Sequence, residues 1–420
     1  MSLHRWDYAK VNSAAMRALF IPVSVEELQE FLRENSLPIS IVGAGYSHGG
    51  HTLLDGGVCL DLRHLNRVFD LTNTTVTVEA GITWQKLQEY LDEHDLSVAE
   101  MQSYANFSIG GSISVNCHGR GMTYGSISDT ILAMEVITSD GQLLTCSPTY
   151  RSYLFRSLIG GYGGIAIIVR VTLLVVPNRV MRREVRRYPF TEEGYQKMLK
   201  EALEPEVLFF NCNVYPHCEE DGFFSYLWYP SETNGTNLPR LQTPKAFYPL
   251  MSLGEQLLRR STIAKQIRGR LEPVATGDVV TWRNYEMSLD VNMHKPLVKF
   301  PTTTVLQEYF LPVDLSYVFL LYLLLICQRY DVNLLNLSIR YVKKATYPLL
   351  NYAPEDRVSF VLYYNIVNST ASCEACKTWT QLLIDFSERV TFYLPYLQLA
   401  TREQVERMYP QIDTYRLVKE

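Results

Sequence analysis

The pattern of apolar and polar positions divides the chain into a first part in which helices and strands alternate and a second part rich in aromatic strands. In the first part, apolar residues at helical spacing predict amphipathic helices over residues 23–37 and 83–94. Short apolar runs predict strands at 38–42, 58–62, 75–80, 131–138 and 165–176. Such alternation is typical of helices packed against sheets, and the pattern stops at Pro177, the predicted boundary.

After Pro177 the chain is dominated by aromatic β-formers, since 18 of the 28 tyrosines follow residue 200. Strands are predicted at 224–229, 305–311 and 359–367, with helices at 315–330 and 376–390. The longest apolar run, at 315–327, has 13 residues. A membrane-spanning helix needs ~20. We therefore expect a buried helix packed on a sheet, and no transmembrane segment.

The glycines cluster, because 17 of the 23 lie between Gly43 and Gly164. They form three segments, of which the first, GAGYSHGG, follows a predicted strand but lacks the third glycine and the helix of a dinucleotide fingerprint. Consecutive backbone N–H groups after a strand can still hold a diphosphate. Three such segments in order predict one large phosphate-bearing ligand. The alternative, three tight turns in a glycine-tolerant sheet, stays open.

Charge and cysteine usage narrow the classes of function. A net charge of −5 argues against a nucleic-acid binder, and the basic run at 179–187 is expected to be the polar side of a strand or a connector. No secretory signal is visible, so we expect a cytoplasmic protein with reduced cysteines, with contact to a membrane surface left open. The single CxxC pair, Cys373 and Cys376, has no second pair, and no metal site is expected.

Five motifs follow one another in order along the first 178 residues. They read PISIVGAGYSHGG, VTVEAGITWQKLQEYLDEHDLS, FSIGGSISVNCHGRG, MEVITSDGQLLTCSP and LIGGYGGIAIIVRVTLLVVP. This order resembles the FAD-linked oxidases of the vanillyl-alcohol-oxidase type. It is most similar to their sugar-acting branch, which includes aldonolactone oxidases, alditol oxidases and decaprenylphosphoryl-ribose oxidase. The resemblance is close over residues 6–178 and loose in the C-terminal half.

The resemblance implies an α+β protein of two domains. A two-subdomain FAD-binding domain would take residues 1–178 and regain the C-terminal segment 393–420. A cap domain, 179–392, would carry an antiparallel sheet flanked by helices. The implied reaction is oxidation of a C–OH group of a sugar, alditol, aldonolactone or sugar conjugate by hydride transfer to FAD. Oxygen, a quinone or a reductase partner would take the electrons.

The resemblance also implies which residues hold FAD. The diphosphate would lie on Gly43, Ala44, Gly45, Tyr46, Ser47, His48 and Gly49. The ribityl chain and flavin would lie along Ser103, Ser108, Ile109, Gly110, Gly111, His118 and Gly119, with the backbone of Ile167 or Ile168 on the adenine side. Covalent members place a histidine where this chain has Tyr46, so non-covalent FAD is predicted. A covalent bond through His48 is the alternative.

By the same resemblance, the catalytic candidates are Glu308, Arg340, Lys343, Tyr396 and Gln398. Glu308 would accept the proton that leaves a carbinol as the hydride departs, and Arg340 or Lys343 would neutralise the developing charge. The alternatives are an exposed strand residue for Glu308 and a solvated basic run for Lys343.

Tyr396 and Gln398 match an aromatic-x-Lys element of the relatives, with Gln398 in the place of the lysine. A neutral amide cannot act as acid, base or counter-charge. A rival function is therefore a flavin-binding or partner-binding protein that has lost turnover. A third reading, an aryl-alcohol or amine oxidase, rests on the tyrosines of the cap.

Overall fold

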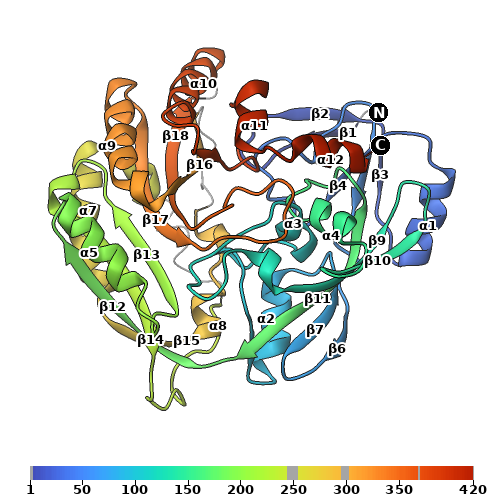
Figure 1. Ribbon diagram of the computed structural model, residues 1–420, viewed down its shortest axis with the longest axis horizontal. Coiled ribbons are helices and arrows are strands. Elements are labelled where there is room, and N and C mark those ends of the chain that lie inside the picture. The colour runs from blue at the N-terminus through green and yellow to red at the C-terminus, as the bar shows by residue number, and fades with distance from the viewer. Residues whose placement is uncertain (1–2, 244–253, 295–301, 368, 420) are drawn as a thin grey trace.

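The computed structural model describes residues 3–243, 254–294, 302–367 and 369–419, which form an N-terminal half and a cap (Figure 1). The N-terminal half reaches Pro177 and contains the smaller sheets. The cap is built on an eight-stranded sheet whose strands lie between Val180 and Phe392. The predicted class, a mixed α and β domain beside an antiparallel cap sheet, is confirmed. The domain limits at 178 and 392 remain predictions.

The first glycine segment follows a small parallel sheet with the order β3-β5-β4. Its strands are β3 (Ala18–Phe20), β4 (Ile39–Val42) and β5 (Val58–Asp61), and a hairpin of β1 (Leu3–Trp6) and β2 (Ser13–Met16) lies beside it in sequence. Helix α1 (Val25–Glu34) begins at Ser24, whose hydroxyl accepts from the Glu27 N–H, and buries Leu28 against this sheet. The strand β4 therefore ends, at Val42, directly before Gly43.

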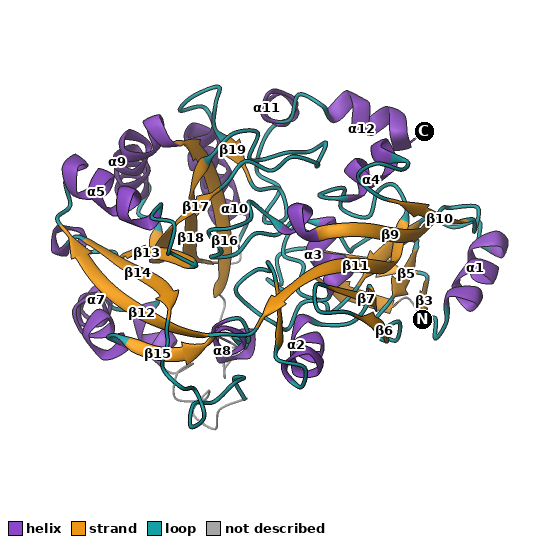
Figure 2. Cartoon of the chain, turned by 60° about the horizontal axis from the view of Figure 1, so that its bottom comes forward, coloured by secondary structure: helices purple, strands orange, loops and turns teal. Residues whose placement is uncertain are grey.

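A second, antiparallel sheet has the order β10-β9-β11-β7-β6, with β8 paired to β11 (Figure 2). Its strands are β6 (Val68–Leu71), β7 (Thr75–Glu79), β8 (Leu96–Val98), β9 (Ile131–Ile137), β10 (Leu143–Cys146) and β11 (Ile167–Pro177). The helices of this region are α2 (Trp84–Asp92), α3 (Ile109–Ser114), η1 (Ile127–Thr130) and α4 (Ser152–Leu158).

Helix α3 differs from the sequence prediction, which treats its glycines as part of a loop. Residues Ile109–Ser114 form a short helix preceded by Ser108. A Cβ at Gly110 would lie 2.9 Å from the Cβ of Ala80, just after β7. Gly110 is thus required for close packing of a helix on the neighbouring chain rather than for a flexible turn.

The cap sheet is antiparallel throughout, with the order β15-β12-β14-β13-β17-β18-β16-β19. Its strands are β12 (Val180–Tyr188), β13 (Phe209–Val214), β14 (Phe223–Pro230), β15 (Val279–Trp282), β16 (Thr302–Pro312), β17 (Asn333–Val342), β18 (Arg357–Val367) and β19 (Thr391–Phe392). The basic run predicted as a strand or connector is therefore a strand, β12.

One face of the cap sheet is covered by α5 (Glu192–Ala202), α9 (Val313–Arg329) and α10 (Thr370–Ile384), which enclose an aromatic core. Helix α10 begins at Thr370, earlier than predicted, because the Ser369 hydroxyl caps it. The prediction of a buried helix holds for only one face of α9, since Leu321 and Leu325 are exposed. In the described part of the chain, no helix combines the length and the apolar character needed to cross a bilayer.

The other face of the cap sheet packs against the N-terminal half, and Phe209 and Trp228 share a core with Met101 and Ile109. This side also carries the long helix α7 (Thr262–Thr276) and the short elements η2 (Glu219–Asp221), α8 (Arg283–Glu286) and η3 (Val291–His294).

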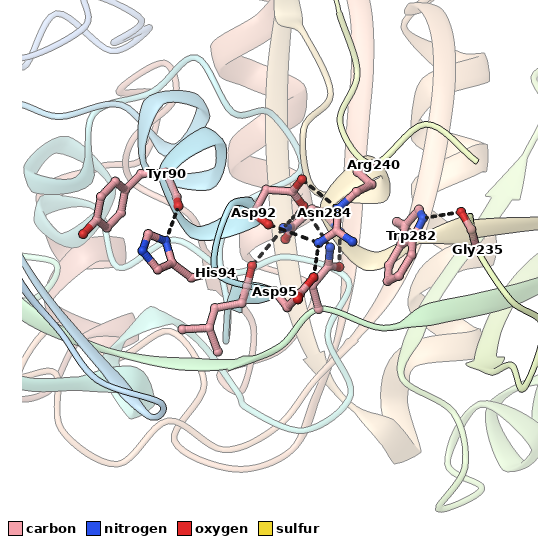
Figure 3. A network of polar contacts seen from close by, with 10 residues as sticks. Tyr90, Asp92, His94, Asp95, Gly235, Arg240, Trp282 and Asn284 are labelled. Atoms are coloured by element: carbon pink, nitrogen blue, oxygen red, sulfur yellow. Dashed lines mark hydrogen bonds and ion pairs between the residues drawn. The ribbon is translucent and has the colours of Figure 1, made fainter. Parts of the chain in front are cut away.

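A polar junction at the end of α2 also joins the two halves (Figure 3). The carboxylate of Asp92 accepts from Arg240 Nε at 2.8 Å and from Asn284 Nδ2 at 2.8 Å. Helix α11 (Arg402–Met408) packs on α10 of the cap, where Gln404 Nε2 donates to the Gln381 carbonyl at 3.2 Å. Helix α12 (Ile412–Lys419) returns to the N-terminal half, where the Tyr415 hydroxyl donates to the Gly161 carbonyl at 2.7 Å.

Candidate active site

The first two glycine segments are in contact where β4 ends. The Ala44 N–H donates to the Ser108 hydroxyl at 3.3 Å, and a Cβ at Gly43 would lie only 1.9 Å from that hydroxyl oxygen. Gly45 has a φ of +84°, which favours glycine. The backbone of this loop and the start of α3 therefore face one another, and no side chain fits between them at Gly43.

His48 lies in an aromatic surround formed by both ends of the chain. Its ring centroid is 5.2 Å from that of Tyr8 and 6.2 Å from that of Tyr396, while Tyr46 packs on Tyr8 and Phe107. Burial lowers the pKa of His48 to about 4, so the imidazole is neutral at physiological pH. Its Nδ1 has no hydrogen-bond partner among the described residues.

Gln398 supports the first glycine loop from outside. Its amide nitrogen donates to the Gly49 carbonyl at 3.0 Å and lies 3.3 Å from His51 Nδ1. The carbonyl of Tyr396 would be 2.2 Å from a Cβ at Gly49, so the segment that carries both residues packs directly on the loop. Gln398 itself is exposed. The structure thus brings Tyr396 and Gln398 to the loop, and it gives Gln398 a structural contact that the sequence did not reveal.

A buried polar contact between the two halves joins His118 to Glu308. His118 Nε2 lies 2.7 Å from Glu308 Oε1, which also accepts from the Ser359 hydroxyl at 2.6 Å. Both side chains of the His118–Glu308 pair are at most 4% exposed. The alternative of an exposed strand residue is therefore wrong for Glu308. Burial alone raises the pKa of Glu308, but His118, Arg340 and Ser359 together outweigh burial and lower it, so Glu308 is a carboxylate at neutral pH.

Arg340 extends this group toward the N-terminal half. Its Nη2 donates to the Ser103 hydroxyl at 3.0 Å, and its Nε has no partner among the described residues. Lys343 is not brought into the group. It is half-buried at the end of β17, and within the described ranges its ammonium makes no hydrogen bond or ion pair.

A row of half-buried amides continues the polar face of the cap sheet beyond Arg340. Asn213 Oδ1, on β13, accepts from the Ser338 hydroxyl at 2.9 Å, and Ser338 in turn accepts from Asn336 Nδ2 at 2.9 Å. Asn211 donates to the same Asn213 oxygen at 3.2 Å. We call these four residues the amide row. The sequence analysis missed it, although the alternating polar positions of 211–213 and 336–340 are its signal.

The third glycine segment borders a narrow cavity that has no free space for a water-sized group. The cavity is lined by Gly161, Gly163, Gly164 and Ile168, among others. The side chain of Ile167 points to the opposite side, into the core with α1. The contact of Ile167 or Ile168 with the adenine side of FAD stays a prediction.

The residues at these segments fit a flavin dinucleotide. Aromatic side chains connect the first glycine loop to the His118–Glu308 pair. The ring centroid of Tyr393 lies 5.6 Å from that of Tyr396 and 6.1 Å from that of His118. Along this line, His48 Nδ1, His118 Nδ1 and Arg340 Nε are buried without partners among the described residues. Buried polar atoms are normally bonded, and phosphate and flavin oxygens and nitrogens complement these groups.

Comparisons with known proteins agree with this fit. Residues 16–147 match a protein family described as an FAD binding domain. L-gulonolactone oxidase of Bos taurus is 28% identical over 233 residues, which are 54% of this chain and 49% of that protein. D-arabinono-1,4-lactone oxidase of Yarrowia lipolytica is 33% identical over 167 residues, 38% of this chain and 32% of that protein. The matched region thus spans half or less of these relatives. The resemblance predicted from the motifs is confirmed.

The fold has a counterpart among solved structures. A solvent-stable cholesterol oxidase superposes with a TM-score of 0.70 at 17% identity, covering 94% of this chain and 86% of that one. Similarity at this level supports the fold of an FAD-binding domain beside a cap.

Proposed function

We propose that this chain, which is related to the FAD-linked aldonolactone oxidases, oxidises a C–OH group of a sugar-type substrate such as an aldonolactone. The observation that carries the proposal is the buried pair of Glu308 and His118. It joins the cap to the glycine-rich half beside Arg340 and the amide row.

Each residue of the group has a chemical role in this reaction. Bound FAD supplies the hydride acceptor. The Glu308 carboxylate, ionised at neutral pH, takes up the hydroxyl proton, and His118 holds that carboxylate in place. The guanidinium of Arg340 stabilises the negative charge that develops on the substrate oxygen.

The amide row supports a substrate with several hydroxyl groups. An asparagine side chain offers two donors and one acceptor oxygen, and a serine hydroxyl offers both kinds. The four residues are half-buried on the face of the cap that meets the N-terminal half, so they are accessible to a ligand. Sugars and their lactones match this chemistry better than an aryl alcohol does.

We also propose that FAD is held without a covalent bond, because Tyr46 stands at the position of the linking histidine in covalent relatives. Denaturation in acid should release the flavin into the supernatant. Flavin that stays with the precipitated protein would instead support a bond through His48.

The reaction is tested by anaerobic reduction of the FAD-loaded protein. L-gulono-1,4-lactone, D-arabinono-1,4-lactone, free sugars and alditols are added in turn, and the flavin absorbance is followed. At least one should bleach the flavin, and air or a quinone added afterwards identifies the electron acceptor. A protein that gains no flavin absorbance from added FAD contradicts the cofactor. A yellow protein that nothing in the panel reduces favours the rival, a flavin-binding protein without turnover.

A further inference from the structure

Glu100 is a buried carboxyl group for which the proposed reaction gives no role. It follows β8 and is 4% exposed, and its Oε2 has no hydrogen-bond partner among the described residues. Two glycines make room for it, because a Cβ at Gly121 would lie 1.9 Å from Oε2 and a Cβ at Gly119 would lie 2.5 Å from Oε1. Gly119 and Gly121 are thus required by Glu100 as well as by a ligand.

The carboxyl group borders a cavity between the two halves, which we call the Glu100 pocket. It is lined by Glu100, Met101, Gln102, Ser103, Arg120, Gly121, Phe209 and Met287. The space in it that a water-sized group can occupy is about 10 Å³, which is about what one water molecule or one hydroxyl group needs. Ser103, which lines it, is the residue that accepts a hydrogen bond from Arg340. The pocket therefore adjoins the proposed reaction centre.

A second unpartnered oxygen lies in the same lining. The amide nitrogen of Gln102 donates to the Tyr104 carbonyl at 2.8 Å, which leaves Gln102 Oε1 without a partner among the described residues. Two buried acceptor oxygens thus lack a well-aligned donor, although the backbone N–H groups of Met101 and Gly121 lie close enough to the Glu100 carboxyl to favour its charged form. Since a buried acceptor without a donor is costly, the pocket calls for a ligand that donates hydrogen bonds.

The charges around the pocket decide which kind of donor fits. Arg283, from α8, and Arg340, from β17, both act on Glu100, and Arg120 lies in the lining with its partner Glu286. Three guanidinium groups disfavour an ammonium ligand, and two acceptor oxygens disfavour an anion. A neutral hydroxyl group donates without carrying charge, so it is the complement of this lining.

The protonation of Glu100 adds a measurable signature. Burial raises the pKa of Glu100 to about 7. Arg283, the backbone N–H of Met101, Arg340 and the backbone N–H of Gly121 offset burial only in part. Cys117 is the thiol that interacts with Glu100. Burial raises the pKa of this thiol far above neutrality, so it stays protonated and does not contribute to the titration near pH 7. A hydroxyl that donates to Oε2 favours the carboxylate over the carboxylic acid. Ligand binding near pH 7 should therefore release a proton from Glu100.

We propose that the Glu100 pocket is a subsite for one hydroxyl group of the sugar-type substrate, which donates a hydrogen bond to Oε2 of the Glu100 carboxylate. This inference rests on the proposed function, because it takes the ligand to be a substrate or analogue of that reaction. It assigns to Glu100 the binding of a hydroxyl and leaves proton abstraction to Glu308.

The test measures lactone binding to FAD-loaded protein that has been reduced under anaerobic conditions, because a reduced flavin cannot accept a hydride and a bound lactone is therefore not oxidised. L-gulono-1,4-lactone and D-arabinono-1,4-lactone are titrated by calorimetry in two buffers of different ionisation enthalpy. The wild type should release a fraction of a proton per lactone bound just below pH 7. Its affinity should tighten as the pH rises through about 7. A ligand-induced drop of one pKa unit corresponds to about a tenfold gain in affinity.

Two variants identify the group that titrates. Glu100→Gln keeps the shape and hydrogen-bonding capacity but cannot ionise, so proton release and the pH dependence should both disappear. Glu135→Gln is the control, because Glu135 is paired with Arg170 on β9 and does not line the pocket. It should behave as the wild type. If Glu100→Gln does not fold with FAD, the wild-type titration decides alone, because binding without proton release overturns the subsite.

The outcomes separate this inference from the proposed function. A lactone that binds with Glu100-dependent proton release but never reduces the flavin supports the subsite and overturns the reaction. A lactone that is oxidised but binds without proton release, or with release unchanged in Glu100→Gln, overturns the subsite and leaves the reaction standing. Absence of binding by both lactones overturns the subsite for lactones, and the reduction panel of sugars and alditols then decides the proposed reaction separately.

Discussion

Glu308 and Glu100 are buried glutamates on opposite halves of the molecule, both within the electrostatic reach of Arg340, and their surroundings differ. Glu308 accepts hydrogen bonds from His118 and Ser359, and its pKa lies below the ordinary value despite burial. Glu100 has an oxygen without a partner, and burial raises its pKa to about 7. Burial is similar, so the donors around each carboxyl decide its state. Glu308 is therefore ionised at neutral pH and able to accept a proton, whereas Glu100, with an unpartnered oxygen, is suited to accept a hydrogen bond from a ligand.

The largest effect is expected from Glu308→Gln. This change removes the proposed proton acceptor and the partner of the buried His118. General base catalysis contributes ~10²–10⁴-fold, so flavin reduction by an active lactone should slow by about 10³-fold. Stopped-flow absorbance under anaerobic conditions measures the rate. Glu135→Gln serves as the control, and a rate within a few-fold of wild type would remove Glu308 from the chemistry and break the contrast.

A smaller effect, on stability rather than on rate, is expected from Glu100→Gln, which should stabilise the folded protein at high pH. A carboxyl whose pKa is raised in the folded state contributes stability below its unfolded pKa of ~4.3, and that stability is lost as the pH rises through about 7. The variant escapes this loss. It should therefore match wild type near pH 4 and exceed it by up to about 3 kcal/mol well above pH 7.

Urea denaturation of the FAD-loaded proteins at several pH values measures this difference. If the gain of Glu100→Gln is the same at every pH, Glu100 does not titrate near neutrality in the folded protein.

Ser359→Ala tests the comparison of the two glutamates, because it removes a hydrogen-bond donor from Glu308 and so leaves this carboxyl with fewer donors, as Glu100 has. It deletes one of the two hydrogen bonds to Glu308 Oε1, and a bond to a charged group contributes ~1.5–3 kcal/mol. The pKa of Glu308 should rise by about one unit. The acid limb of the pH profile for flavin reduction should move upward by the same amount. Ser225→Ala, in another buried serine of the cap, is the matched control. An unmoved acid limb would mean that the hydroxyl does not stabilise the carboxylate.

The smallest effect is expected from Gln398→Ala. Gln398 contacts the first glycine loop and touches neither glutamate, and one neutral hydrogen bond contributes ~0.5–1.5 kcal/mol. FAD should bind a few-fold more weakly, as measured by quenching of flavin fluorescence, with the rate of flavin reduction unchanged. A loss of rate similar to that of Glu308→Gln would place Gln398 among the reacting groups.

The features of this site that depend on a local pattern of residues could be predicted from the sequence. The apolar strand before Gly43, the order of the glycine segments and Glu308 on a predicted strand all follow from spacing or motif. The helical state of residues 109–114 did not, because glycine and serine are poor helix formers and the contact with Ala80 overrides that propensity.

Contacts between segments that lie far apart in the chain could not be predicted from local sequence patterns. His118 and Glu308 are 190 positions apart, and Asn213 meets Ser338 only because β13 lies beside β17 in the sheet. Glu100 looks like a lone acid after a short apolar run, and its unusual state arises from the glycines and arginines that surround it in space. Pairing and burial across the junction are therefore visible only once the order of the strands is known.

The His118–Glu308 contact also bears on how a ligand enters and leaves. A hinged opening of the cap would separate this pair, the Arg120–Glu286 pair and the Arg240–Asp92 contact at the same time. Movement of side chains and loops at the rim would leave all three contacts in place. We therefore expect ligands to exchange through such local movement, with the interior contacts between the two halves kept.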